Sequence, residues 1–116
     1  MIRKTQLEVK ENPLGGEGIM EFNHILTREE ISDHGKIFAH IVIKPKSYTK
    51  WHHHIDSKEI YYVLSGNGNY TDVDGSVHPI SKGDVCCSGY DHWHCVENCS
   101  ETENLEVIAL ILNKPE

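Results

Sequence analysis

Short segments of strand-forming residues, separated by turn residues, fill the chain from residue 37 to residue 112. They are rich in β-branched and aromatic residues, and glycine, proline, asparagine or aspartate stands between most of them. The strongest of these turn signals, Asp74-Gly75, predicts a tight hairpin. The strands that we expect span residues 37–43, 59–64, 69–73, 76–80, 85–87, 94–97 and 105–112. Many short strands at such regular spacing favour a β-sandwich or a β-barrel.

The first 36 residues carry weaker strand signals, and residues 12–18 have the composition of a loop. Thr27 followed by Glu30 predicts the capping box of one short helix, which ends before Gly35. We therefore expect an N-terminal arm, loop and short helix over residues 1–36, packed on a barrel formed by residues 37–116. The glycine-rich stretch 14–18 is either a lid over the barrel or an ordinary connection.

The net charge argues against some kinds of binding partner. The 116 residues fit one domain, and they carry a formal charge of −7 with no basic run, which argues against nucleic acid and acidic membranes as partners. No apolar run reaches the length of a membrane span or a signal peptide, so we expect a cytoplasmic protein that binds a small molecule. The four cysteines lack zinc-site spacing, and we expect free thiols.

Histidine is unusually frequent, with nine residues, and three of them are adjacent at positions 52–54. This triplet is internal and short, so it is no purification tag. On an extended strand His52 and His54 project from one face, and a hairpin would return Glu59 to them. His94 heads another expected strand and is the candidate fourth ligand. These donors suit one divalent metal ion, with Mn, Fe, Zn and Ni all compatible.

The spacing of these residues resembles the first sequence motif of the cupin family. His52, His54, Glu59 and Gly66 stand at the intervals of that motif's two histidines, glutamate and final glycine. Where the motif opens with glycine, this chain has Lys46.

The second cupin motif is matched by Gly83, His94 and Asn98 at the expected intervals. The chain departs from it at Gly89, where the family has proline, and at Asp91, where the family has glycine. These departures affect the turn before His94 and leave every liganding position intact.

The resemblance implies an all-β double-stranded β-helix (jelly-roll) cupin barrel of six to eight antiparallel strands. It implies a metal held by three histidines and one glutamate, with open positions for water or substrate. A cupin that has lost its metal and keeps an empty pocket is the alternative.

Three further residues are candidates for roles near this site. Tyr61 shares a strand face with Glu59, so its phenol either acts on a substrate or fills the barrel. His92 is either a base or substitute ligand in the pocket or a turn residue facing solvent. His40 faces either the pocket or the outside.

The sequence leaves the class of function open. The resemblance to cupins implies a small metalloenzyme of dioxygenase, isomerase or lyase type that acts on a small oxygen-bearing molecule. The alternatives are a non-catalytic module that binds a small molecule or metal, and a storage or structural role. Exposed sheet edges and the N-terminal arm favour a homodimer.

Overall fold

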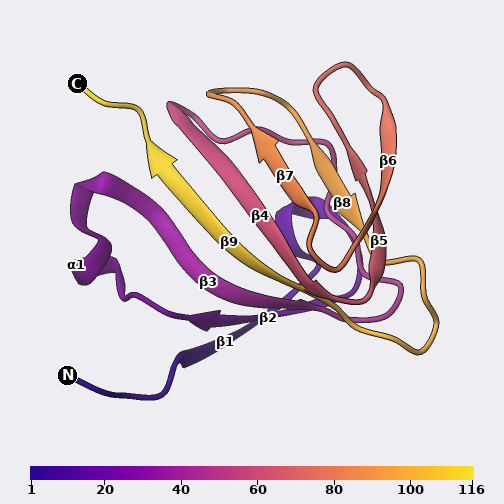
Figure 1. The fold of residues 1–116 in the computed structure, drawn as a ribbon, viewed down its shortest axis with the longest axis horizontal. Coiled ribbons are helices and arrows are strands. Elements are labelled where there is room, and N and C mark those ends of the chain that lie inside the picture. The colour runs from indigo at the N-terminus through magenta and orange to yellow at the C-terminus, as the bar shows by residue number, and fades with distance from the viewer.

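Two antiparallel sheets make up the fold (Figure 1). The computed structural model describes residues 1–116, except for the side chain of Pro13. In the described residues, the larger sheet has the strand order β1-β2-β3-β9-β4-β7 and the smaller has the order β6-β5-β8. The strands are β1 (Gln6–Glu11), β2 (Ile19–His24), β3 (Gly35–Ile43), β4 (Ser57–Ser65), β5 (Asn67–Thr71), β6 (Val77–Ser81), β7 (Val85–Ser88), β8 (Cys95–Glu97) and β9 (Leu105–Asn113).

The predicted all-β jelly-roll is confirmed. Each of the seven expected strands is present, and its ends lie within two residues of the predicted ones. The described residues form nine strands rather than six to eight, because β1 and β2 add to one edge of the larger sheet. Both lie before residue 37, within the region expected to form an arm, a loop and a helix. The division into an arm and a barrel at residue 36 stays a prediction.

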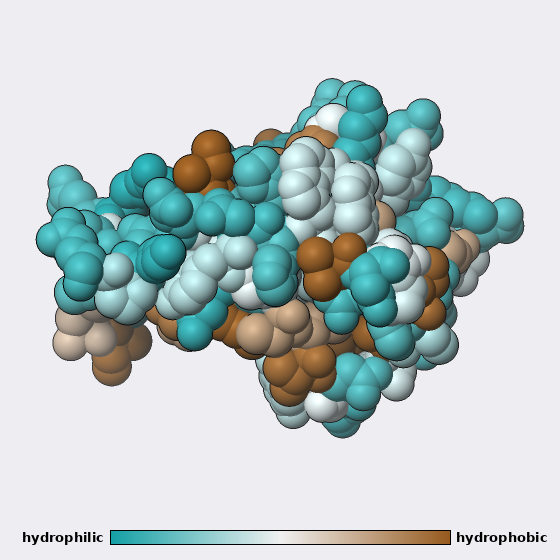
Figure 2. All heavy atoms as spheres, turned by 90° about the horizontal axis from the view of Figure 1, so that it is seen from above, coloured by the Kyte–Doolittle hydropathy of each residue, from teal (hydrophilic) through white to brown (hydrophobic). Residues whose placement is uncertain are grey.

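The inner faces of the two sheets share one hydrophobic core. On β9, the side chains of Leu105, Val107, Ala109 and Ile111 alternate inward, as the two-residue period of a strand requires. The smaller sheet contributes buried side chains such as Val96 to the same core. The face shown in Figure 2 is mainly hydrophilic, and its hydrophobic residues form small separate groups. The buried apolar residues form the core between the sheets.

The one α-helix of the described chain, α1 (Arg28–Ile31), begins with the predicted capping box. The Glu30 N–H donates to Thr27 Oγ1 at 3.2 Å, and the Thr27 N–H donates to Glu30 Oε1 at 2.8 Å. The guanidinium of Arg3 also pairs with Glu30, which ties the N-terminus to the helix. Two short 3₁₀ turns, η1 (Pro13–Gly15) and η2 (Ser32–His34), complete the secondary structure.

Two other expectations concern the loops and the cysteines. The predicted hairpin is confirmed: β5 and β6 pair on either side of Asp74-Gly75, and Gly75 has a φ of 82°. All four cysteines are free, and Cys86 is the one that points into the core. No helix in the described part of the chain is long and apolar enough to cross a membrane.

Candidate metal centre

The four predicted ligands come from three parts of the chain. Glu59 lies on β4 and points to its buried face. His52 and His54 lie between β3 and β4, and His94 directly precedes β8. An isolated bridge joins His52 to His94, with backbone hydrogen bonds of 3.0 and 2.8 Å. This bridge brings the two sequence motifs together.

The expectation that His52 and His54 lie on one regular strand is wrong for residues 53 and 54, which lie outside the strands and bridges. The chain turns at Asp56, whose φ is 51°, and the Asp56 N–H donates to Asp91 Oδ1 at 2.8 Å instead of to a neighbouring strand. The two imidazoles nevertheless lie close together, with ring centroids 5.0 Å apart.

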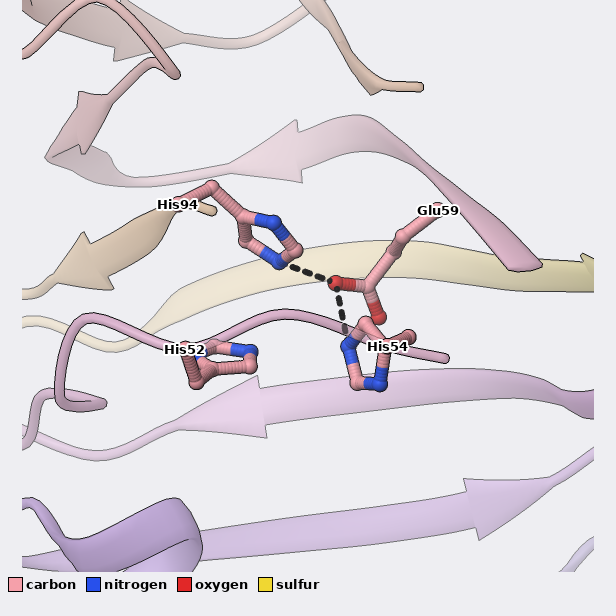
Figure 3. A group of neighbouring side chains, drawn as sticks. All are labelled: His52, His54, Glu59 and His94. Atoms are coloured by element: carbon pink, nitrogen blue, oxygen red, sulfur yellow. Dashed lines mark hydrogen bonds and ion pairs between the residues drawn. The ribbon is translucent and has the colours of Figure 1, made fainter. Parts of the chain in front are cut away.

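Figure 3 shows the four side chains directed toward one shared space. One ligand atom from each residue can be chosen so that all four lie within 4.8 Å of one another. Glu59 Oε1 is 2.8 Å from His94 Nε2 and 3.3 Å from His54 Nε2. Ligands at the usual ~2.1 Å from a metal are about 3 Å apart when they are neighbours around it. The cluster therefore has the dimensions of a coordination shell.

The hydrogen bonds of the histidines fit a metal ion. His52 Nδ1 donates to the Lys50 carbonyl at 2.6 Å, and His94 Nδ1 donates to the His92 carbonyl at 3.3 Å. These bonds leave the Nε2 lone pair of each ring facing the shared space. His94 Nε2 then faces the carboxylate of Glu59, a contact that is attractive only with a proton or a metal ion between the two atoms.

Two buried nitrogens of the cluster also lack a hydrogen-bond partner among the described atoms, His52 Nε2 and His54 Nε2. His54 Nε2 is within ion-pair distance of Glu59, but its geometry is not that of a hydrogen bond. Buried polar atoms are normally paired, so nitrogens of this kind indicate a missing partner. A divalent cation would satisfy both.

The protonation states also suit a metal. Burial raises the pKa of Glu59, but the close imidazoles of His54 and His94 outweigh it and lower that pKa to about 2. Burial lowers the pKa of His52; His94 and His54 lower it further, and the hydrogen bond to the Lys50 carbonyl opposes them. At neutral pH the centre therefore offers a carboxylate and, at His52, a neutral imidazole, the forms that bind metals.

A cavity of about 140 Å³ opens beside the cluster. His54 and Glu59 line it, whereas His52 and His94 do not, so a small molecule in the cavity meets the centre from the first two ligands. Most of the remaining lining is apolar and comes from the inner face of the larger sheet. Leu14 of η1 also lines the cavity and is half exposed. The glycine-rich loop therefore lies at the cavity mouth.

The other candidate residues lie in three different places. Tyr61 points inward, is 5% exposed and lines the cavity. Burial raises the pKa of Tyr61 well above its ordinary value and the charge of Glu59 raises it further, so the phenol keeps its proton. The His92 side chain is exposed, and only its carbonyl serves the centre. His40 is half-buried beside Glu106, 2.8 Å away, and does not line the cavity.

Aromatic rings surround the histidines. Tyr70 of β5 stacks on the ring of His94 at a centroid distance of 5.9 Å. The Trp93 ring stacks on His53 and on Trp51. Tyr70 carried no site signal in the sequence, because a tyrosine on a strand is ordinarily part of a core. Tyr70 therefore restricts the ring of the candidate ligand His94, whereas Trp93 restricts His53, which lies outside the cluster.

Two of the three departures from the cupin motifs, at Lys46 and Asp91, keep the backbone that the family's glycines provide. Lys46 has a φ of 64° and Asp91 a φ of 58°, both in the left-handed region that favours glycine. At Gly89, a Cβ atom would lie 2.9 Å from the His92 ring. Gly66, which matches the last glycine of the first motif, has a φ of 87° and no room for a Cβ beside the Asn104 carbonyl.

Comparison with known proteins gives three matches of interest. The Cupin domain family matches residues 39–111. An oxalate-binding protein of Thermotoga maritima is 37% identical over 101 residues, which cover 87% of this chain and 82% of that protein. The crystal structure of a predicted oxalate decarboxylase from Thermotoga maritima has a TM-score of 0.85 and 35% identity, and the match covers 94% of this chain and 93% of the other.

More distant structures share the fold alone. A polyketide cyclase from Streptomyces resistomycificus has a TM-score of 0.74 at 15% identity, and the match covers all of this chain and 83% of the other. The family match extends over more than half of the chain, and the residues of both motifs from His52 to Asn98 lie within it. The chain belongs to the cupin family.

Proposed function

We propose that this protein is a metal-dependent enzyme that acts on a small carboxylate or a similar oxygen-bearing molecule. His52, His54, Glu59 and His94 would hold one divalent ion, of Mn, Fe, Zn or Ni type. The observation that carries the proposal is the convergence of these four donors beside a cavity that two of them, His54 and Glu59, line. Oxalate, which the names of both Thermotoga proteins contain, is the first ligand to test.

When bound, such an ion acts as a Lewis acid and leaves positions open for substrate oxygens. The residues of the chain would orient the metal ligands and donate a proton to the substrate. The carbonyls of Lys50 and His92 fix the ring tautomers of His52 and His94. Tyr61 carries a protonated phenol into the cavity, where it would donate a hydrogen bond or a proton to a bound oxygen.

Metal content tests the ligand set. Protein purified without a tag or a metal column should contain, or take up, about one divalent ion per chain. His54→Ala and Glu59→Ala should remove most of that uptake, because each deletes one of four donors. His40→Ala is the matched control and should bind as the wild type does, since His40 lies outside the cluster. Wild-type protein that takes up no metal would end the proposal.

Turnover then separates reaction types. Metal-loaded protein is incubated with oxalate, small hydroxy acids and small diketones, with and without oxygen. Product formed only with Fe(II) or Mn(II) and oxygen indicates a dioxygenase. Product formed with Zn(II) or without oxygen indicates an isomerase or a lyase. Tyr61→Phe should lower the rate of turnover more than it weakens metal binding.

The second candidate is a module that binds a small molecule without converting it. The description of one Thermotoga relative as an oxalate-binding protein favours it. Saturable binding of oxalate to the metal-loaded protein, with no product under any of these conditions, would establish this alternative.

We also propose that the protein is a cytoplasmic homodimer. Four free cysteines suit a reducing compartment. At one edge of the larger sheet, β1 is exposed along its whole length and presents Leu7 and Val9 to solvent. A strand edge of this kind can pair with a second copy. Light scattering should give twice the mass of the chain, and the monomer mass would contradict the proposal.

A further inference from the structure

The cavity beside the candidate metal centre is mainly apolar, a property that the metal ligands do not explain. Beyond His54 and Glu59, its wall is built mainly from six buried apolar side chains: Met20, Phe22, Ile41, Ile43, Val107 and Ile111. These residues come from β2, β3 and β9, and they also belong, apart from Ile111, to the main hydrophobic core. A substrate made only of polar groups would leave this wall without a partner.

The described lining offers no second site for an anion. Its one cationic side chain is that of Lys10, which is about half exposed at the mouth. The Lys10 ammonium lies 3.9 Å from Glu8 Oε1 and 4.8 Å from the centre of the Phe22 ring, so it already has partners. The other polar groups of the wall are the hydroxyls of Thr49 and Tyr61. A second carboxylate inside the cavity would therefore lack a positive partner.

The net charge of the metal-loaded centre also favours a ligand with a single negative charge. A divalent ion with three neutral histidines and the Glu59 carboxylate carries one net positive charge. A ligand with one negative charge neutralises it, whereas a dianion leaves one negative charge against an apolar wall. Burying a net charge in such surroundings is unfavourable.

We propose that the ligand of this centre is a short-chain aliphatic acid with an oxygen on the carbon next to its carboxylate, a 2-oxo or 2-hydroxy acid. This inference rests on the metal site of the proposed function. The two adjacent oxygens would chelate the divalent ion from the side of the cavity that His54 and Glu59 line. The aliphatic tail lies against Ile41 and its apolar neighbours. The volume of about 140 Å³ holds roughly five groups of the size of a water molecule or a methyl group, so a tail longer than about four carbons would not fit.

Calorimetric titration of the Mn(II)-loaded protein tests the proposal. The ligands are oxalate, pyruvate, 2-oxobutanoate, 2-oxopentanoate and 2-oxooctanoate, with 2-hydroxypentanoate to compare the two kinds of oxygen. Each methylene that enters an apolar site contributes about 0.8 kcal/mol, which is about a fourfold gain in affinity. We expect affinity to rise roughly fifteenfold from pyruvate to 2-oxopentanoate and to fall for 2-oxooctanoate, which exceeds the cavity.

A matched pair of variants locates the tail. Ile41→Val removes one methylene from the cavity wall, and Ile80→Val removes one from the same core away from the cavity. We expect Ile41→Val to weaken 2-oxopentanoate about two- to fourfold and to leave pyruvate unchanged, while Ile80→Val changes neither. Equal effects of the two variants would show that the tail does not contact this wall and would overturn the proposal.

The controls separate this inference from the metal site itself. Metal content is measured before each titration. Protein with one Mn(II) per chain that binds oxalate as tightly as 2-oxopentanoate, or binds all the 2-oxo acids equally or not at all, overturns the inference and leaves the metal site standing. Protein that holds no metal removes both.

Discussion

Lys46 and Asp91 occupy left-handed backbone positions at which a side chain carries a conformational penalty. The two residues differ in the interactions that their side chains make. The Lys46 ammonium reaches only Glu101, 3.9 Å away, and both side chains are mostly exposed, so this ion pair contributes little. Asp91 Oδ1 instead accepts the Asp56 N–H and holds the turn between His54 and Glu59. Asp91 thus has a structural reason to replace glycine, and Lys46 has none that the structure shows.

Lys46→Gly should therefore stabilise the protein by about 0.5–1 kcal/mol, because relief of the left-handed strain exceeds the added entropy of the unfolded chain. Urea unfolding measures the change. Asp91→Gly is the paired variant, and its gain should be offset by loss of the Asp56 hydrogen bond. A Lys46→Gly protein that is less stable than the wild type would contradict this interpretation.

The carboxyl of Glu59 gives the metal-free protein a specific dependence on acid. Its pKa lies at about 2 in the folded protein, below the ordinary value of 4.5. The unfolded chain therefore takes up the proton first, so the contribution of this group is complete above pH 4.5 and is lost as the pH falls toward 2.

Urea unfolding should measure the unfolding free energy of the metal-free wild type and of metal-free Glu59→Gln between neutral pH and the acid range. The difference in unfolding free energy should be constant above pH 4.5 and should decrease below it. A difference that does not change with pH would mean that His54 and His94 do not stabilise the charged carboxylate.

Among the elements, the segment after β8 depends on one buried amide. Asn98 Nδ2 is placed to donate to the carbonyls of Ile43, Lys44 and Glu103, at 2.9, 3.2 and 2.8 Å. Its Oδ1 accepts the Ser100 N–H at 3.1 Å. The asparagine of the second cupin motif thus joins the end of β3 to the loop before β9.

Asn98→Ala should cost about 2–3 kcal/mol in unfolding free energy, because it leaves buried carbonyls without donors. Asn67→Ala is the control, since Asn67 is exposed on β5 and its replacement should change stability by less than about 0.5 kcal/mol. Thermal or urea unfolding of the two variants measures both values. Equal stability of the two would show that Asn98 is not a structural link.

The sequence predicted the elements whose residues follow one clear period. β9 alternates buried and partly buried residues, and this hydrophobic pattern correctly predicts a strand. β1 was missed because all six of its residues are exposed, so neither face shows an apolar pattern. The strands from β3 onward have a buried inner face, and that face is what residue patterns report. β2 also buries Met20 and Phe22, but two alternating apolar residues are too short a pattern to predict a strand.

The sequence also predicted only part of the candidate site. The spacing of His54 and Glu59 was recognisable because ligand chemistry is specific to residue type. The carbonyls of Lys50 and His92 that orient the rings could not be predicted, because every residue has a carbonyl. The cavity was also beyond prediction, since its wall joins residues from Lys10 to Ile111 that only the folded sheet brings together.

For the molecule as a whole, binding of the proposed metal would be coupled to folding. Ligands that bind only the folded state raise its stability, by about 2.7 kcal/mol at a hundred times the dissociation constant. For a domain of this size, that increase should raise the melting temperature by roughly 10 °C. Scanning calorimetry with and without metal should show this rise, and EDTA should reverse it. Glu59→Gln should remove most of the rise, and an equal rise in that variant would place the metal elsewhere.

The chain has two tryptophans, and each directly precedes a candidate metal ligand. Trp51 precedes His52, Trp93 precedes His94, and the two indoles stack at a centroid distance of 6.4 Å. The tryptophan fluorescence of the protein therefore comes from this one end of the barrel. A paramagnetic ion such as Mn(II) at the centre should quench it, which gives an optical record of metal entry and departure without any label. The same signal reports little on β1 and β2, whose unfolding requires a different probe.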